Sequence, residues 1–89
     1  MRWSKEERAK GLAAVCQGKR GMELKEKGER LASVRPLFEG QHHWEITGWY
    51  WYAAGHNTHS TPCQTMEQAM AEALSVMKAE RVKRKEVPQ

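Results

Sequence analysis

The 89-residue sequence contains no aspartate, only one phenylalanine, and no apolar run longer than a handful of residues. Without aspartate the chain lacks the usual group that orients a catalytic histidine. Its glycines are scattered singly rather than gathered into a phosphate-binding loop. We therefore expect a protein that is not an enzyme and that holds no cofactor. A membrane-spanning helix needs about 20 apolar residues, so we also expect no membrane segment.

Secretion signals and a disulfide framework are missing as well. The first residues, MRWSKEERAKG, contain no apolar stretch of the kind that a secretory signal needs, so the expected location is the cytoplasm. Cys16 and Cys63 lie far apart in the chain and should remain thiols there. We expect Cys16 to be half-buried and Cys63 to lie at a strand edge. A chain of this length predicts a single domain over residues 1–89.

Charge is distributed unevenly along the chain, although the net charge is only +4. Residues 1–35 carry ten Lys/Arg and five Glu, and residues 36–77 carry four Glu and no Lys or Arg. Residues 78–89 carry five Lys/Arg and two Glu. The three segments therefore have net charges of +5, −4 and +3. The basic character belongs to the two ends, and the aromatic middle is acidic.

Helix-forming residues dominate the basic segment 1–35. Ser4 and Glu7 have the spacing of a capping box and open a run rich in Ala, Glu, Lys and Arg. Gly18 should end this first helix. In MELKEKGERLASV, residues 22–34, acidic and basic side chains recur at i,i+4 spacing, which predicts a second helix ending before Pro36. We expect a helical segment here, formed by one helix or by a helix pair.

The middle of the chain predicts a three-stranded antiparallel sheet over residues 42–64. The stretch HHWEITGWYWYAA alternates cleanly if Thr47 and Gly48 form a two-residue hairpin turn. This register gives the hairpin an apolar face and a polar aromatic face. The apolar face holds Trp44, Ile46, Trp49 and Trp51. The polar face holds His43, Glu45, Tyr50 and Tyr52. A third strand follows in HSTPCQ, at the sheet edge because Pro62 has no amide donor.

Residues 65–84 predict an amphipathic helix, followed by a frayed tail over residues 85–89. Thr65 opens this helix, and Gln68 occupies the capping-box position. Apolar side chains recur every three or four residues, at Met66, Ala69, Met70, Ala73, Leu74 and Met77. This stripe should pack on the tryptophan face. The predicted fold class is α+β, with an N-terminal helix or helix pair, a three-stranded antiparallel sheet and a C-terminal helix packed on the sheet.

One group of residues, between positions 56 and 63, has the makeup of a candidate metal site. His56, His59 and Cys63 have the spacing H-x2-H-x3-C, and nitrogen and sulfur ligands suit zinc. The sequence has no C-x2-C pair to complete such a site, so we expect a polar turn with exposed imidazoles and no metal. His42, His43, Asn57 and His59 also resemble the ββα-metal nucleases. The helix that follows them has no His or Asn to bind the metal.

The pattern WEI…GWYWY…TMEQAMAEA, within residues 42–78, resembles the DNA-binding domains of the AP2 and integrase-arm type. The resemblance implies three strands and a helix, with basic residues on the sheet that read the major groove. Residues 36–77 contain no Lys or Arg, so phosphate contacts would have to come from the basic ends. The candidates are Lys5, Arg8, Lys10, Lys19, Arg20, Lys78, Arg81, Lys83, Arg84 and Lys85. The alternative is that these cations form ordinary solvated helix surfaces.

The polar face of the predicted hairpin offers a second kind of binding surface. A tyrosine-rich patch without lysine is typical of the core of a protein interface. The partner-binding residues would be Tyr50, Tyr52, His43 and Glu45. Alternatively, the N-terminal helix covers the tyrosines through Leu12 and Val15.

The short, tryptophan-rich chain with its TMEQAMAEA helix resembles the small accessory proteins of bacteriophages, including inhibitors of the anti-CRISPR type. This resemblance implies a non-enzymatic protein that acts in the host bacterial cytoplasm. We therefore predict a module that docks on a protein partner, such as a bacterial defence or nucleic-acid-processing complex, and inhibits or modulates it. The alternative is a small basic DNA- or RNA-binding regulator that uses its basic termini. The sequence leaves the oligomeric state open.

Overall fold

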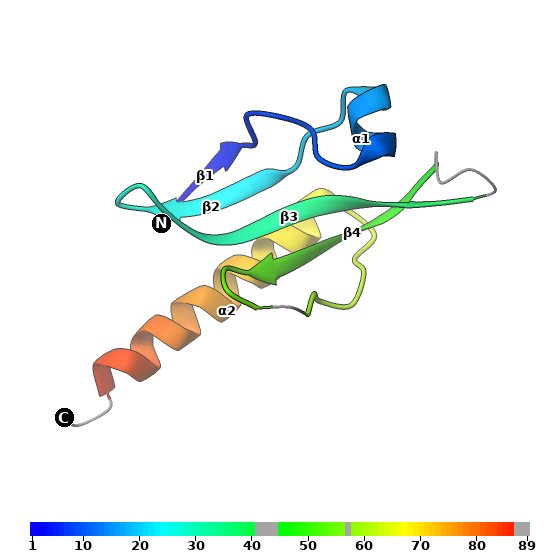
Figure 1. The fold of residues 1–89 in the computed structure, drawn as a ribbon. Helices are drawn as coiled ribbons and strands as arrows, with labels where there is room; N and C mark the ends of the chain where they lie inside the picture. Colours follow the sequence, from blue (N-terminus) through cyan, green and yellow to red (C-terminus); the bar gives the residue numbers. More distant parts are fainter. Residues whose placement is uncertain (41–44, 57, 87–89) are drawn as a thin grey trace.

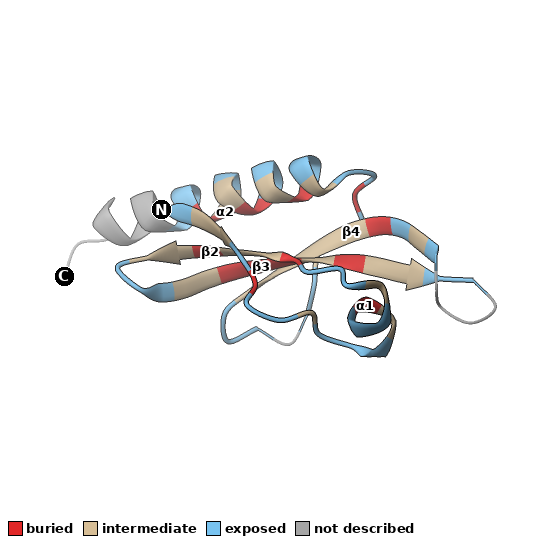
Figure 2. Ribbon diagram, turned by 90° about the horizontal axis from the view of Figure 1, so that it is seen from above, coloured by how far each residue is buried: buried red, intermediate tan, exposed pale blue. Residues whose placement is uncertain are grey.

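The computed structural model describes residues 1–40, 45–56 and 58–86, with side chains as far as residue 80. Its elements are β1 (Arg2–Lys5), α1 (Leu12–Gln17), β2 (Met22–Glu26), β3 (Glu29–Glu39), β4 (Glu45–Ala53) and α2 (Met66–Glu86). The strands form a four-stranded antiparallel sheet in the order β1-β2-β3-β4. α2 lies along one face of the sheet, and α1 lies on the opposite side (Figure 1 and Figure 2). The α+β class and the C-terminal helix on the sheet are therefore confirmed.

The predicted N-terminal helices are wrong, apart from the six residues of α1. Residues 2–5 form the edge strand β1, and residues 22–34 belong to the β2–β3 hairpin. Lys27 (φ 52°) and Gly28 (φ 80°) form the two-residue turn of this hairpin. Positive φ at both central residues is what a type I′ turn requires. Pairing with neighbouring strands outweighs the local helix preference of Glu- and Lys-rich sequence.

Pro36, which was expected to stop a helix, lies inside β3 and is buried. It pairs with Trp49 of β4. The amide of Trp49 donates to the carbonyl of Cys63 at 2.8 Å, and its carbonyl accepts from the amide of Cys63 at 2.6 Å. Because both backbone groups of Trp49 are directed toward Cys63, the missing amide of Pro36 removes no hydrogen bond from the β3–β4 pair.

The hairpin turn predicted at Thr47 and Gly48 is also wrong, because both residues lie inside β4. A shift in the β3–β4 register leaves Thr47 as the extra residue of a β-bulge. A Cβ atom on Gly48 would lie 2.9 Å from the carbonyl oxygen of Cys63. Gly48 therefore permits the chain before α2 to approach β4 closely and does not reverse the chain.

The predicted third strand, HSTPCQ, is not a strand. It runs along the outer edge of β4, where Cys63 forms an isolated bridge with Trp49 and the amide of Ser60 donates to the carbonyl of Trp51 at 2.8 Å. The edge position expected from Pro62 is therefore correct, although the regular strand is absent. The three strands implied for residues 42–78 are likewise wrong, since β4 is the only strand among the described residues of that range.

The core lies between the sheet and α2, as predicted. Ala69 and Ala73 of α2 are fully buried, and they share two clusters with Ala32 and Val34 of β3. Larger side chains are partly buried against these clusters, among them Trp3, Met22, Trp49, Trp51, Met66 and Met70. The small residues bring helix and sheet close together, and a larger side chain at either α2 alanine would cost about 1–3 kcal/mol through overpacking.

α2 begins where the capping pattern predicts. The amide of Gln68 donates to Oγ1 of Thr65 at 3.1 Å, which supplies an acceptor for one of the free amides in the first turn. The helix continues to Glu86, slightly beyond the predicted end. Within the part of the chain that the structure describes, no helix has the length and hydropathy needed to cross a bilayer.

Candidate functional site

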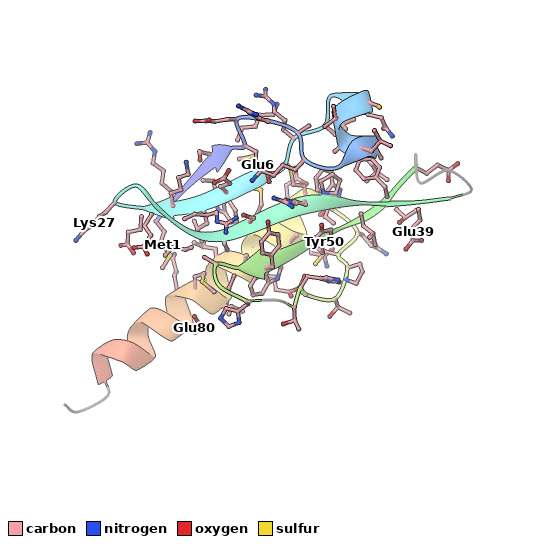
Figure 3. The ribbon with its side chains drawn as sticks, in the orientation of Figure 1. Met1, Glu6, Lys27, Glu39, Tyr50 and Glu80 are labelled. Carbon is pink, nitrogen blue, oxygen red and sulfur yellow. The ribbon has the colours of Figure 1, made fainter. Side chains whose placement is uncertain are left out.

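One face of the sheet carries polar side chains, on the side away from α2. In β4 the alternation places Trp49 and Trp51 toward α2 and Tyr50 and Tyr52 on the opposite side. The register then adds cross-strand neighbours to the tyrosine side: Arg35 pairs with Tyr50, and Ser33 pairs with Tyr52. Figure 3 labels Tyr50 on β4. Both tyrosines are half-buried.

The aromatic rings on this face form a continuous cluster. The rings of Tyr50 and Tyr52 stack with centroids 6.4 Å apart and an interplanar angle of 28°. The exposed ring of His59 lies 4.9 Å from Tyr50, tilted by 51°. Nδ1 of His59 lies 2.8 Å from the carbonyl oxygen of Ser60, so this nitrogen carries the proton and donates. That hydrogen bond holds the imidazole beside the tyrosines.

Two guanidinium groups stack on the ring of Tyr52. Arg30 lies 5.7 Å from the ring centroid and Arg35 lies 5.2 Å from it. Nη1 of Arg30 also donates to Oγ of Ser33 at 3.1 Å. Each cation–π contact of this kind contributes about 0.5–1 kcal/mol at an exposed site. We call the set Arg30, Arg35, Tyr50, Tyr52 and His59 the Arg–Tyr face.

Arg35 is held in place by a buried carboxylate. Its Nε donates to Oε1 of Glu6 at 3.3 Å, and the two side chains are 24% and 2% exposed. The backbone amide of Glu6 donates to the carbonyl of Gly21 at 3.0 Å. A Cβ atom on Gly21 would lie 2.0 Å from the carbonyl oxygen of Val34 and 2.9 Å from Oε1 of Glu6. Only glycine fits at this position, because the carbonyl of Val34 leaves no room for a Cβ atom.

The open face as a whole is more basic than acidic. Besides Arg30 and Arg35, the register places Arg2 of β1 and Lys25 of β2 on this side, because they pair across the strands. The carboxylate of Glu23 lies 4.0 Å from the ammonium of Lys25, a weak surface pair. Acidic residues on the other side of the sheet include the exposed Glu67 and Glu72 of α2.

The structure brings together only part of the predicted partner-binding set. Tyr50 and Tyr52 lie side by side, whereas His43 falls outside the described residues. Glu45 begins β4, five residues before Tyr50, which is roughly 16 Å along a strand. It therefore does not rim the tyrosines. Leu12 and Val15 are 79% and 58% exposed, so the alternative that they bury the tyrosines is wrong.

The predicted basic residues do not form one surface. Those described are all exposed, and they are Lys5, Arg8, Lys10, Lys19, Arg20 and Lys78. Lys78 belongs to α2, on the other side of the sheet from α1 and the residues around it (Figure 2). The side chains of Arg81, Lys83, Arg84 and Lys85 lie outside the described set. The sheet cations Lys25, Arg30 and Arg35 were missed, because their segment was assigned to a helix.

Cys63 is separated from His59, another member of the candidate zinc set. It is buried against α2, whereas His59 lies on the tyrosine side. Burial raises the pKa of the Cys63 thiol above its usual 9.0, as do the charge of Glu72 and the hydrogen bond that Oε2 of Glu72 accepts from Sγ at 3.6 Å. Among the described residues, no three or more His, Cys, Asp or Glu side chains are grouped to hold a metal.

The exposures of the two cysteines differ. Cys16 is exposed rather than half-buried, and Cys63 is buried; both are free thiols.

Comparison of the chain with protein-family models, with curated proteins and with solved structures gives no significant match. The chemistry of the Arg–Tyr face is therefore the basis for any functional assignment.

Proposed function

We propose that this chain is a non-enzymatic protein that binds single-stranded nucleic acid on its Arg–Tyr face. The observation that carries the proposal is the stacking of two arginines on Tyr52, next to the stacked ring of Tyr50. Surfaces that bind single strands combine aromatic rings, on which bases stack, with cations that follow the phosphates. The Arg–Tyr face has both kinds of group within one small area.

The aromatic rings and the arginines of the Arg–Tyr face contact different parts of the nucleic acid. Unpaired bases stack on the rings of Tyr50 and His59, which are at least partly exposed, and on the guanidinium planes that lie over Tyr52. Stacking of one base on an aromatic side chain contributes about 1–3 kcal/mol. Arg30 and Arg35 have planar guanidinium groups with several donors, which suit phosphate oxygens and also stack on bases. A duplex hides its base faces, so the single strand is the better ligand.

The Glu6–Arg35 pair prepares Arg35 for this role. Within the described residues, Nε is the only guanidinium nitrogen of Arg35 for which the structure records a hydrogen bond. Nη1 and Nη2 are therefore available to a phosphate, while Glu6 fixes the direction of the side chain. The pair also lowers the net charge of the face, which predicts moderate affinity.

The test is a fluorescence-anisotropy titration with single-stranded and duplex DNA and RNA of the same sequence. Two phosphate contacts, from Arg30 and Arg35, predict a salt slope of about −1.4, so affinity should fall about sevenfold between 50 and 200 mM salt. Tyr52→Leu, which keeps the apolar volume, should weaken binding about tenfold through lost stacking. Arg30→Gln should weaken it several-fold and reduce the salt slope by about 0.7.

Lys78→Gln provides the matched control, because it removes one positive charge from α2 on the other side of the sheet. Its affinity for the single strand should equal that of the wild type. Equal loss in Lys78→Gln and Arg30→Gln would mean that only net charge matters. No binding of any oligonucleotide at 50 mM salt would end the proposal.

A protein partner is the second candidate, and one observation favours it. Leu12 and Val15 are exposed on α1, on the same side of the sheet as the tyrosines. Together with Tyr and Arg side chains, such residues are typical of protein interfaces. A bacterial defence or nucleic-acid-processing complex with an acidic surface would fit this basic face. Capture of one defined complex that resists 200 mM salt and is lost in the Leu12→Ser, Val15→Ser variant would favour this function.

A further inference from the structure

A recess of about 330 Å³ adjoins the Arg–Tyr face at one end. One wall is formed by residues 10–14, which lead into and include the start of α1, and the other by residues 35–38 of β3 together with Tyr50. Arg35 and Tyr50 belong both to this recess and to the Arg–Tyr face. The volume lies at the lower end of the range for small-ligand pockets, and it suits a group the size of one nucleotide.

The lining has the polarity that an anionic aromatic ligand requires. Lys10 and Arg35 supply two cations, and no carboxylate is among the residues that line the recess. Leu37, Phe38 and Tyr50 supply apolar and aromatic wall. Another recess in the described part of the structure, next to Met77, is lined by Glu26, Glu29 and Glu80 and has the opposite character.

α1 also blocks the path that a bound nucleic-acid strand would take over the sheet. A strand that stacks on Tyr52 and then on Tyr50 reaches residues 10–14 next, since these residues share the recess with Tyr50. In Figure 2, α1 stands out from the sheet on the side opposite α2. The geometry therefore favours a chain end at this position over a strand that continues.

We propose that this recess binds the terminal phosphate-bearing nucleotide of a single strand. The proposal rests on the proposed function and adds to it a preference for strand ends. A phosphate monoester carries about −1.5 to −2 charges at pH 7, whereas an internal diester carries one. The two positive charges of Lys10 and Arg35 match the charge of the monoester. The terminal base lies against Tyr50 and Phe38.

The experiment compares three single strands of identical sequence, with a 5′-phosphate, with a 3′-phosphate, or with hydroxyls at both ends. One phosphorylated strand should bind about 5- to 10-fold more tightly than the hydroxyl strand, because a charge-assisted contact is added in a partly exposed site. Whichever phosphorylated end, 5′ or 3′, gives the tighter binding is the end that enters the recess. In Lys10→Gln this ratio should fall close to one.

Lys19→Gln is the matched control, because Lys19 is an exposed cation that does not line the recess. This variant should keep the wild-type ratio between phosphorylated and hydroxyl strands. Equal binding of all three strands by the wild type would overturn the inference and leave the proposed function intact. A ratio that survives Lys10→Gln would also overturn it.

A second measurement separates this inference from the proposed function. Adenosine 5′-monophosphate and adenosine 3′-monophosphate are titrated into the ¹⁵N-labelled protein, with adenosine as the control. Shifts confined to the amides of Leu37, Phe38 and Tyr50, with a nucleotide but not with adenosine, would support the recess even if no strand binds. The absence of any shift with either nucleotide would overturn the inference on its own.

Discussion

The ion pair of Arg35 and Glu6 allows a sharp test of the structure through a double-mutant cycle. Glu6 is 2% exposed, and its recorded side-chain partner is Nε of Arg35 at 3.3 Å. Arg35→Gln leaves a buried carboxylate without a compensating cation. Loss of one partner from a buried pair costs about 3–5 kcal/mol. Because the Arg35 side chain is 24% exposed, water can reach part of the gap, and we expect about 2–3 kcal/mol.

The reverse substitution should cost less. Glu6→Gln keeps an oxygen that accepts from Nε of Arg35, and the partly exposed guanidinium can be hydrated, so we expect a loss of about 1 kcal/mol. The double variant has neither charge and should be more stable than Arg35→Gln alone. The expected coupling energy between the two positions is therefore about 1.5–2 kcal/mol.

Urea unfolding followed by tryptophan fluorescence and circular dichroism measures all four proteins. In a domain of this size, Arg35→Gln should lower the melting temperature by roughly 10–20 °C. Arg30→Gln is the control, since Arg30 stacks on the same ring but donates to Ser33. It should cost less than about 1 kcal/mol. Additive effects of the Arg35 and Glu6 substitutions, with no coupling, would refute the buried pair.

Three other predictions concern the backbone and the thiols. Gly21→Ala should cost at least about 3 kcal/mol, because its Cβ would clash with the backbone oxygen of Val34; a variant with unchanged urea midpoint would contradict the close approach of Gly21 to β3. Lys27→Asn should stabilise the turn by about 0.5–1 kcal/mol, since asparagine tolerates positive φ better; a lower melting temperature would argue against a type I′ turn. Cys16 should react with a thiol reagent at once and Cys63 only on unfolding. Since the pKa of Cys63 is raised in the folded state, its stabilising contribution is complete below the unfolded pKa of 9.0 and is lost as the pH rises above it, so Cys63→Ala should lose less stability than the wild type above pH 9.0.

The parts of the fold that were predicted correctly are those set by local sequence. The start of α2 follows from Thr65 and Gln68, whose capping contact the structure contains. The division of β4 into a tryptophan side and a tyrosine side follows from strict alternation in WYWY. The helix cap depends only on residues four positions apart or fewer, and the alternation of β4 holds whichever strand pairs with it. Both could therefore be predicted without knowledge of the rest of the molecule.

The parts that failed depend on contacts between distant segments. Residues 22–34 contain good helix formers, yet Met22 and Leu24 pack toward the α2 side while Glu23 and Lys25 lie on the other side, which is a strand pattern. The Lys-Gly turn and this alternation together were the available signal. The glycine in β4 was misread because its role, the close approach of Cys63, is visible only in three dimensions.

Only the tyrosines of the candidate site were predicted, because their arginine partners come from a distant segment of the chain. The tyrosines were identified from the sequence of β4 alone, whereas their arginine partners lie on β3, which was taken for a helix. Residues 36–77 contain no Lys or Arg, but β3 begins before them, at Glu29. Arg30 and Arg35 of β3 lie on the tyrosine side, so the sheet does carry cations there. A chain-long charge profile does not show which charges share a surface.

The order of the strands also bears on how the protein folds. Because every strand pairs with its neighbour in sequence, most of the sheet is built from contacts that are short in sequence separation. Such topologies fold faster than sheets with distant pairings. The β2–β3 hairpin, with its two-residue turn, can form within microseconds and template β4. β1 can pair with β2 only after a longer loop, which contains α1, has closed. We therefore expect the ion pair of Glu6 and Arg35 to form late in folding, after Tyr50 and Tyr52 have paired with β3.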